Sequence, residues 1–453
     1  MDEKQLNYEF MSILSESHPG LTFEEYRDNC VFLLFYQYLC LRFNDAFEEQ
    51  YKLSAMVRLA VRGKLQLGAF IKFAENASPF IHMAGAPFQL TEFSFYQKLL
   101  KVQSLEKQKS FARFIRKLIK KMDSWDCPDM LYAHFGDLFG KLLVGFSRMK
   151  KDTYISEGLL SLHHMFFEGE NVRKVFLPDF QYGILLGAML SGIEEGEIFG
   201  YEQRESLMEL FRMYCYIKHV PKESLHICRK EVWESDAGYA GQFDAVSIFM
   251  PDGVEPGTLL LKREHMAEET RQMTTVAKGE FPLILSALPL LRDRGLMTVV
   301  IPSALLYREG KEAQIRRFLV EEMNCLEAVM LLPDHAFQST GQNEVLLFFR
   351  KNREREEIMF FDCSEMDSLE GEDLSSIRNA WKEKKTVPGF CSLVSRKHIK
   401  ENDYNLNLPR YITRSVRAAQ IDLEQRRRRI EEIDRELLEI EKRIAMYRRD
   451  LNL

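Results

Sequence analysis

Hydrophobic and polar positions follow three different patterns along the chain. Residues 1–150 show helical periodicity, few glycines and no convincing alternation of apolar and polar positions. Thr22 precedes Glu25 by three positions, which is the spacing of a capping box and predicts a helix through Leu41. Residues 101–122 combine helical apolar spacing with many lysines and arginines. We predict an all-helical region whose basic helix face is either solvated or turned toward DNA or a partner.

The second pattern, over residues 151–413, begins with short β-branched or aromatic runs that alternate with helical stretches. The predicted strands are 174–177, 197–201, 224–229, 243–249, 297–302, 325–332 and 344–349. The predicted helices are 183–193, 204–219, 281–292 and 311–322, and residues 353–413 are mixed and polar. This order predicts an α/β fold with a mostly parallel sheet and helices on both faces. Ligands bind beyond the carboxyl ends of such strands, so we expect a site after Leu177, Tyr201 and Phe249.

The third pattern is a heptad repeat over residues 414–453. The a positions are Val416, Leu423, Ile430, Leu437, Ile444 and Leu451, and the apolar d positions are Ala419, Ile433, Ile440 and Tyr447. Arg426 is the one charged d residue, and the arginine run 426–429 is interpreted as a solvated stretch rather than a phosphate contact. About five heptads predict a coiled-coil helix, which needs a partner helix to cover its apolar stripe.

Composition narrows the class of protein. The 453 residues are 46% apolar and 29% charged, as in an ordinary soluble globular protein. The net charge of −6 means that any DNA contact must come from a local patch. The start is acidic and has no apolar signal region, and the longest apolar run, 30–41, is shorter than the ~20 residues of a membrane span. The eight cysteines form no C-x-x-C pair and are interpreted as reduced thiols. We expect a cytoplasmic protein with no membrane contact.

Four stretches then point to one family. Residues 21–43 read LTFEEYRDNCVFLLFYQYLCLRF, residues 299–352 run from VVIPSALL to LLFFRKN, residues 401–412 read ENDYNLNLPRYI, and the heptads follow. Together they resemble the modification subunit of type I restriction-modification systems, a family of adenine-N6 DNA methyltransferases. The resemblance implies a Rossmann-like methyltransferase sheet domain (151–413) between a helical domain (1–150) and a coiled-coil helix (414–453). It also implies a specificity subunit, an active methyltransferase subunit, or both, as partners through the coiled coil, and double-stranded DNA within that complex.

The cofactor turn of that family, Asp-Pro-x-x-Gly-Ser/Thr-Gly, is altered in this chain. The matching residues are Leu177, Pro178, Asp179, Phe180, Gln181, Tyr182 and Gly183. Leu177 replaces the acidic residue and Gln181 replaces a glycine, and a side chain at that glycine restricts φ and fills ligand space. Glu202 holds the place of the acidic residue that binds the cofactor's ribose, although a surface carboxylate after a strand is the simpler interpretation. We therefore expect no cofactor, or S-adenosylmethionine if the protein is active.

The catalytic motif of the family, Asn-Pro-Pro-Phe/Tyr, is altered as well. The matching residues are Phe249, Met250, Pro251 and Asp252. In the family the Asn side chain accepts hydrogen bonds from the adenine amine and the aromatic ring stacks on the flipped base. Phe249 offers no such acceptor and Asp252 cannot stack. An unpaired buried amine costs ~1–3 kcal/mol in binding, and lost transition-state contacts cost orders of magnitude in rate.

Other candidate chemistry is weak. His163 and His164 are adjacent in a helical stretch, and adjacent residues do not share a helix face, so we expect no metal there. The dipeptide at 334–335 resembles a loop of the family and is interpreted as structural. The sequence contains no P-loop and no Ser/Cys–His nucleophile pattern.

Two independent losses favour a catalytically silent relative that assembles with its partners on DNA in a restriction-modification or related antiviral defence system. Two alternatives stay open. One is an active S-adenosylmethionine-dependent adenine-N6 methyltransferase with divergent motifs, in which Asp252 takes the Asn role. The other is a protein-interaction scaffold that does not bind DNA. Salt-dependent DNA binding would distinguish the silent, DNA-bound relative from this scaffold.

Overall fold

A computed structural model describes residues 2–413 apart from 17, 19, 84–103, 151–153, 178–195, 202–204, 229–239, 250–267, 277–279, 335, 339–342 and 367. Residues Met1–Ile412 form one compact unit. The heptads at 414–453 and the predicted helix 183–193 lie outside the described residues.

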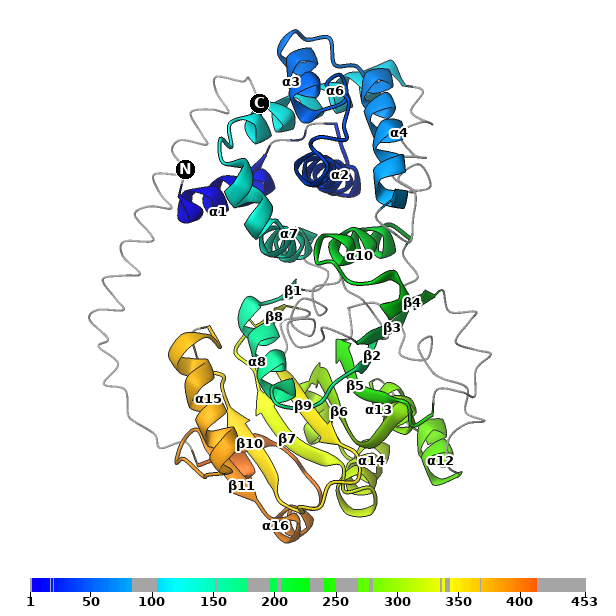
Figure 1. Ribbon diagram of the computed structural model, residues 1–453. Helices are drawn as coiled ribbons and strands as arrows, with labels where there is room; N and C mark the ends of the chain where they lie inside the picture. Colours follow the sequence, from blue (N-terminus) through cyan, green and yellow to red (C-terminus); the bar gives the residue numbers. More distant parts are fainter. Residues whose placement is uncertain are drawn as a thin grey trace, which may run out of the picture. The chain divides into compact units, whose positions relative to one another are not determined.

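The N-terminal part is helical throughout its described residues (Figure 1). Its helices are α1 (Glu3–Met11), α2 (Phe23–Arg42), α3 (Leu53–Val61), α4 (Leu67–Met83), α6 (Leu105–Asp123) and α7 (Pro128–Lys150). The predicted capping box is confirmed: the Glu25 N–H donates to Thr22 Oγ1 at 3.2 Å, and the Thr22 N–H donates to Glu25 Oε2 at 2.9 Å. Both orphan donors at the start of α2 are therefore satisfied.

Nine of the described strands form one sheet in the order β11-β10-β7-β9-β6-β5-β2-β3-β4. They are β2 (Lys174–Leu177), β3 (Glu197–Tyr201), β4 (Leu225–Cys228), β5 (Phe243–Phe249), β6 (Leu291–Pro302), β7 (Leu326–Leu331), β9 (Glu344–Arg350), β10 (Ile358–Asp362) and β11 (Cys391–Val394). The pairs among β4, β3, β2, β5 and β6 are parallel, as is β7 with β10. β9 runs antiparallel between β6 and β7, and β11 antiparallel to β10, so the prediction of a mostly parallel sheet is confirmed.

Helices cover both faces of the sheet, as predicted (Figure 1). α8 (Glu157–Phe167) and α15 (Gly371–Glu383) pack on one face, in a core that continues into the N-terminal helices. α13 (Phe281–Ala287) and α14 (Lys311–Arg317) pack on the other face in a separate core. Strand β5 serves both, because alternate residues of a strand point to opposite faces: Ala245 lies in the first core and Val246 in the second.

The remaining described helices lie at or beyond the sheet's margins: α10 (Glu205–Ile217), α12 (Glu268–Val276) and α16 (Arg396–Glu401). α10 packs against the N-terminal helices, where Lys218 Nζ lies 2.9 Å from Asp137 of α7. A two-stranded sheet of β1 (Tyr154–Ile155) and β8 (Phe337–Gln338) ties the residues after α7 to the loop after β7. Among the helices that the structure describes, none combines the length and hydropathy needed to cross a bilayer.

Two predicted elements need correction. The predicted helix 281–292 is wrong at its end, because α13 stops at Ala287 and a short 3₁₀ turn leads into β6 at Leu291. The polar appearance of residues 353–413 concealed β10, α15, β11 and α16. The early start of β6 is a tertiary effect, since the Arg294 N–H donates to the Lys351 carbonyl and the Lys351 N–H to the Gly295 carbonyl across the turn after β9.

Candidate functional site

The chain changes direction across the sheet between β2 and β5. From β2 it builds β3 and β4 on one side and then returns to the other side of β2 as β5. The two strands pair in parallel, with Val175 opposite Ala245, so Leu177 and Phe249 end their strands at the same edge. In an open parallel sheet this switch point is where a ligand crevice forms.

The structure thus brings together the two segments that the sequence singled out. Leu177 is fully buried at the end of β2, opposite Gly200 of β3, and Phe249 ends β5 opposite Val300. An apolar buried side chain offers a cofactor no hydrogen-bonding atom, so Leu177 does not fit the role of the family's acidic residue. The other predicted site residues lie outside the described part of the chain: Pro178, Asp179, Gly183, Glu202, Met250, Pro251 and Asp252.

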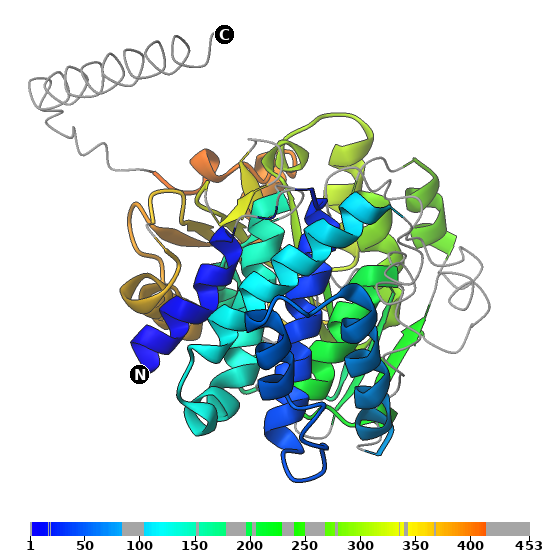
Figure 2. The ribbon, with the colours of Figure 1, turned by 90° about the horizontal axis from the view of Figure 1, so that it is seen from above.

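The N-terminal helices lie on the side of the sheet to which the carboxyl end of β7 points. The small sheet of β1 and β8 lies on that side too. Figure 1 shows the helices beyond β1 and β8, and Figure 2 shows them, in blue to cyan, in front of the strands. Contact between the two parts is close: a Cβ at Gly140 of α7 would approach the Tyr214 hydroxyl of α10 to 2.9 Å. The N-terminal helices and α10 therefore pack closely on this side of the molecule.

A buried polar network joins α8 to β5 and β6 near the crevice edge, and we did not predict it from the sequence. His163 Nδ1 lies 3.1 Å from Thr298 Oγ1 of β6 and 3.3 Å from Ser247 Oγ of β5, and the two hydroxyls are 2.7 Å apart. All three side chains are buried. Ser247 lies two residues before the end of β5. The available signal was a single hydroxyl within each of two apolar runs, 245–249 of β5 and 296–301 of β6.

Burial determines the charge of this network. Desolvation lowers the pKa of His163 to about 3, so the imidazole is neutral near neutral pH. A neutral imidazole can exchange hydrogen bonds with both hydroxyls and hold α8 against β5 and β6. It is unsuited to general acid–base work near pH 7, for which a pKa near the working pH is best.

Two further anchors position the strands around the switch point. At the amino end, Asp244 Oδ2 accepts hydrogen bonds from the N–H groups of Arg173 and Lys174, both at 2.7 Å, and the carboxylate pairs with Arg292 of β6. These contacts join β2, β5 and β6 at their bases. A buried carboxylate held by two N–H donors and a guanidinium is fully compensated.

At the other end of β6, Arg316 of α14 holds the segment ENDYNLNLPRYI. Its buried guanidinium donates to the carbonyls of Tyr404 at 2.9 Å, Leu305 at 2.9 Å and Arg308 at 2.8 Å. Burial lowers the pKa of Arg316 to about 10, which leaves it charged at neutral pH. The segment that carries the most specific resemblance is therefore docked against the loop after β6, next to the crevice edge.

In the described part of the chain, no three His, Cys, Asp or Glu side chains are grouped so that they could bind a metal ion. His163 is engaged with hydroxyls, and the sequence expectation for the adjacent pair 163–164 rested on helix geometry alone.

Comparison with known families places this geometry in context. A model of the N-6 DNA methylase family matches residues 185–419. The type I restriction enzyme MjaVIII methylase subunit of Methanocaldococcus jannaschii is 31% identical over 167 residues, which cover 34% of this chain and 29% of that protein. The MjaVII methylase subunit of the same organism is 23% identical over 363 residues, which cover 74% of this chain and 62% of the relative. The chain thus spans less than two thirds of these relatives.

Solved structures show the same fold. The methyltransferase subunit of a type I restriction-modification system from Streptococcus thermophilus superposes with a TM-score of 0.70 at 18% identity, over 90% of this chain and 98% of that one. A protein from a study of type I restriction-modification complex assembly has a TM-score of 0.54 at 15% identity, over 98% of this chain and 97% of that one. At these identities the likeness establishes the arrangement of elements.

Proposed function

The chain belongs to the N-6 DNA methylase family, and we propose that it is a catalytically silent counterpart of the type I modification subunits, because both family motifs are altered. It assembles with a specificity subunit, an active methyltransferase, or both, on double-stranded DNA. We place the assembled complex in the cytoplasm, as part of a restriction-modification or related defence system. In a complex with two modification subunits, the silent copy grips DNA while the other performs chemistry.

The observation that carries this proposal is the shared edge of β2 and β5. The segments that depart from both family motifs begin at the adjacent ends of these two strands, at the switch point where a ligand crevice forms. Leu177 is buried and apolar where an acidic residue is needed. Gln181, which lies outside the described residues, stands where the family's pattern has a glycine.

The defect in the catalytic motif is independent of the first. Phe249 provides no acceptor for the adenine amine, and Asp252 provides no ring to stack on the flipped base. Restoring one motif would leave the other defective. Loss of both functions in one chain favours a structural role over a variant active site.

The test is calorimetric titration of the full chain with S-adenosylmethionine, repeated with the demethylated product. We expect no saturable heat up to about 1 mM, which corresponds to a binding free energy weaker than about −4 kcal/mol. Clear stoichiometric binding would contradict our interpretation of residues 177–183. Circular dichroism of the same sample shows that the protein is folded.

A methyl-transfer assay on duplex DNA with labelled S-adenosylmethionine separates the silent protein from the divergent enzyme. We expect no labelled DNA. If label is transferred, Asp252→Ala should abolish it when Asp252 has taken the Asn role, while the matched control Asp45→Ala, an exposed aspartate in the helical part, should leave it unchanged.

A further inference from the structure

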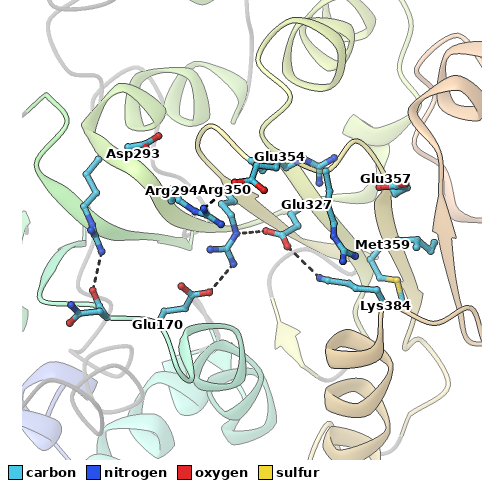
Figure 3. A pocket seen from close by; sticks show the side chains of 14 residues that line it. Glu170, Asp293, Arg294, Glu327, Arg350, Glu354, Glu357, Met359 and Lys384 are labelled. Carbon is cyan, nitrogen blue, oxygen red and sulfur yellow. Dashed lines mark hydrogen bonds and ion pairs between the residues drawn. The ribbon is translucent and has the colours of Figure 1, made fainter.

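A pocket of about 740 Å³ lies at the edge of the sheet opposite the switch point (Figure 3). It is formed where β6, β7 and β10 begin and where β9 ends, and all its lining residues are described. From Arg294, near the start of β6, to Pro302 at its end is roughly 25 Å along the strand. The pocket is therefore separate from the crevice at the carboxyl edge, and the inference drawn from it does not depend on the proposed function.

Two acidic side chains of this pocket, Glu327 and Glu170, have cationic partners. Glu327 Oε2 accepts from Arg350 Nε at 2.7 Å, and Glu327 Oε1 from Lys384 Nζ at 3.3 Å. Arg350 Nη2 also donates to Glu170 at 2.9 Å. Figure 3 shows these ion pairs as dashed lines among the side chains that line the pocket. Glu354 pairs with Arg294, and Asp293 and Glu357 complete the acidic side chains of the lining. No ion pair within the described residues joins any of these carboxylates to Arg353 or Arg355.

Arg353 is a buried cation of this pocket. Its side chain is 8% exposed, its Nε donates to Asn324 Oδ1 at 3.2 Å, and its Nη1 is buried without a hydrogen-bond partner among the described residues. An unpaired donor on a buried charged group costs more than one on a neutral group. Asn324 in turn donates to the carbonyls of Arg353 and Arg355, which fixes this connector after β9.

The lining holds six cationic and five acidic side chains, so its net charge is slightly positive. Burial is the main cause that lowers the pKa of Lys384 to about 8, Glu327 opposes that change, and the nearby Arg350 and Arg355 add to it. The guanidinium of Arg355 is exposed and makes no ion pair within the described part of the chain. Arg353 and Arg355 thus present two guanidinium groups to the pocket without a carboxylate bound to either.

We propose that this pocket binds a phosphorylated small molecule of nucleotide size, whose phosphate oxygens accept hydrogen bonds from Arg353 and Arg355. Guanidinium groups bind phosphate oxygens in pairs, with charge-assisted hydrogen bonds. Met359 and Leu393 add an apolar surface for the rest of the ligand, and the volume lies within the usual range for small-molecule sites. In this proposal, a phosphate oxygen becomes the partner that the Arg353 Nη1 lacks.

The experiment is calorimetric titration of the full chain with inorganic pyrophosphate and with ADP. We expect saturable one-to-one binding of both probes, with ADP the tighter because it also contacts the apolar surface. Arg353→Gln and, separately, Arg355→Gln should weaken binding about tenfold or more. Arg355 is exposed, so its variant keeps the test valid if Arg353→Gln does not fold.

The matched control is Arg308→Gln, which removes an exposed arginine after the far end of β6 and should leave both affinities unchanged. Absence of saturable binding of either probe would overturn the proposal. An equal loss in Arg308→Gln would overturn it too, because binding would then reflect the overall charge rather than this pocket. Equal affinities for pyrophosphate and ADP would overturn the assignment of nucleotide size.

Discussion

His163 is a buried histidine whose neutrality is part of the fold. The folded protein protonates it near pH 3, whereas the unfolded chain does so near the ordinary pKa of 6.5. The unfolded state therefore binds more protons between these values. The stability associated with the neutral ring is complete above pH 6.5 and decreases as the pH falls toward 3, by about 1.4 kcal/mol per pH unit.

Replacement by asparagine tests this at one residue. His163→Asn keeps a polar group near the position of Nδ1 but does not titrate, so we expect a variant about 1–3 kcal/mol less stable at pH 7.5. The difference from the original protein should shrink by about 2 kcal/mol at pH 5.0. Urea unfolding at both pH values measures it. An unchanged difference for His163→Asn would refute the assignment.

Among the elements, α6 shows how a single helix separates core from surface. Its apolar positions, including Phe111, Phe114 and Leu118, are buried as the spacing predicted. Lys117 and Lys121 both pair with Glu16, next to α2. Lys109, Arg113 and Lys120 are exposed along one side of the helix, and no ion pair engages them within the described residues.

We expect these three cations to contact the DNA backbone. Lys109→Gln, Arg113→Gln and Lys120→Gln together should weaken duplex binding for all sequences and reduce the slope of log affinity against log salt by about two to three. Fluorescence anisotropy across a salt series gives that slope.

The control removes three exposed cations from the sheet part, with Lys382→Gln, Lys385→Gln and Lys397→Gln. An equal change of slope in this control would contradict the prediction that the exposed cations of α6 contact DNA. No DNA binding by the original protein, even at low salt, would favour the scaffold without DNA.

For the whole molecule, assembly is predicted to depend on the heptads at 414–453. Ile433 and Ile440 occupy d positions, where apolar side chains enter the partner's helix surface. Ile433→Gln with Ile440→Gln should abolish capture of a specificity subunit in co-purification while leaving the urea unfolding curve unchanged. Arg435→Gln with Lys442→Gln changes f positions two residues further along and should leave capture intact. Capture that survives the d-position change would contradict the coiled-coil assignment.

Much of the local structure was determined by the sequence alone, because its signals are local. The Thr22–Glu25 box, the apolar spacing of α6 and the runs that form β2, β3 and β5 each depend on neighbours within one element. The two altered motifs were also recognisable from residue type. The two-residue strands β1 and β8, and the four-residue strand β11 within a mixed polar segment, gave no comparable signal.

Only the tertiary structure decided which distant residues meet. The order of strands makes β2 and β5 neighbours that end at the same edge, although 71 residues lie between Leu177 and Phe249 in the chain. It also brings His163 to Ser247 and Thr298, and Arg350 to Glu170, from separate elements. The antiparallel direction of β9 places the connector with Arg353 at the amino edge of its neighbours. Such contacts follow from pairing and burial across the whole sheet, which no local window of sequence specifies.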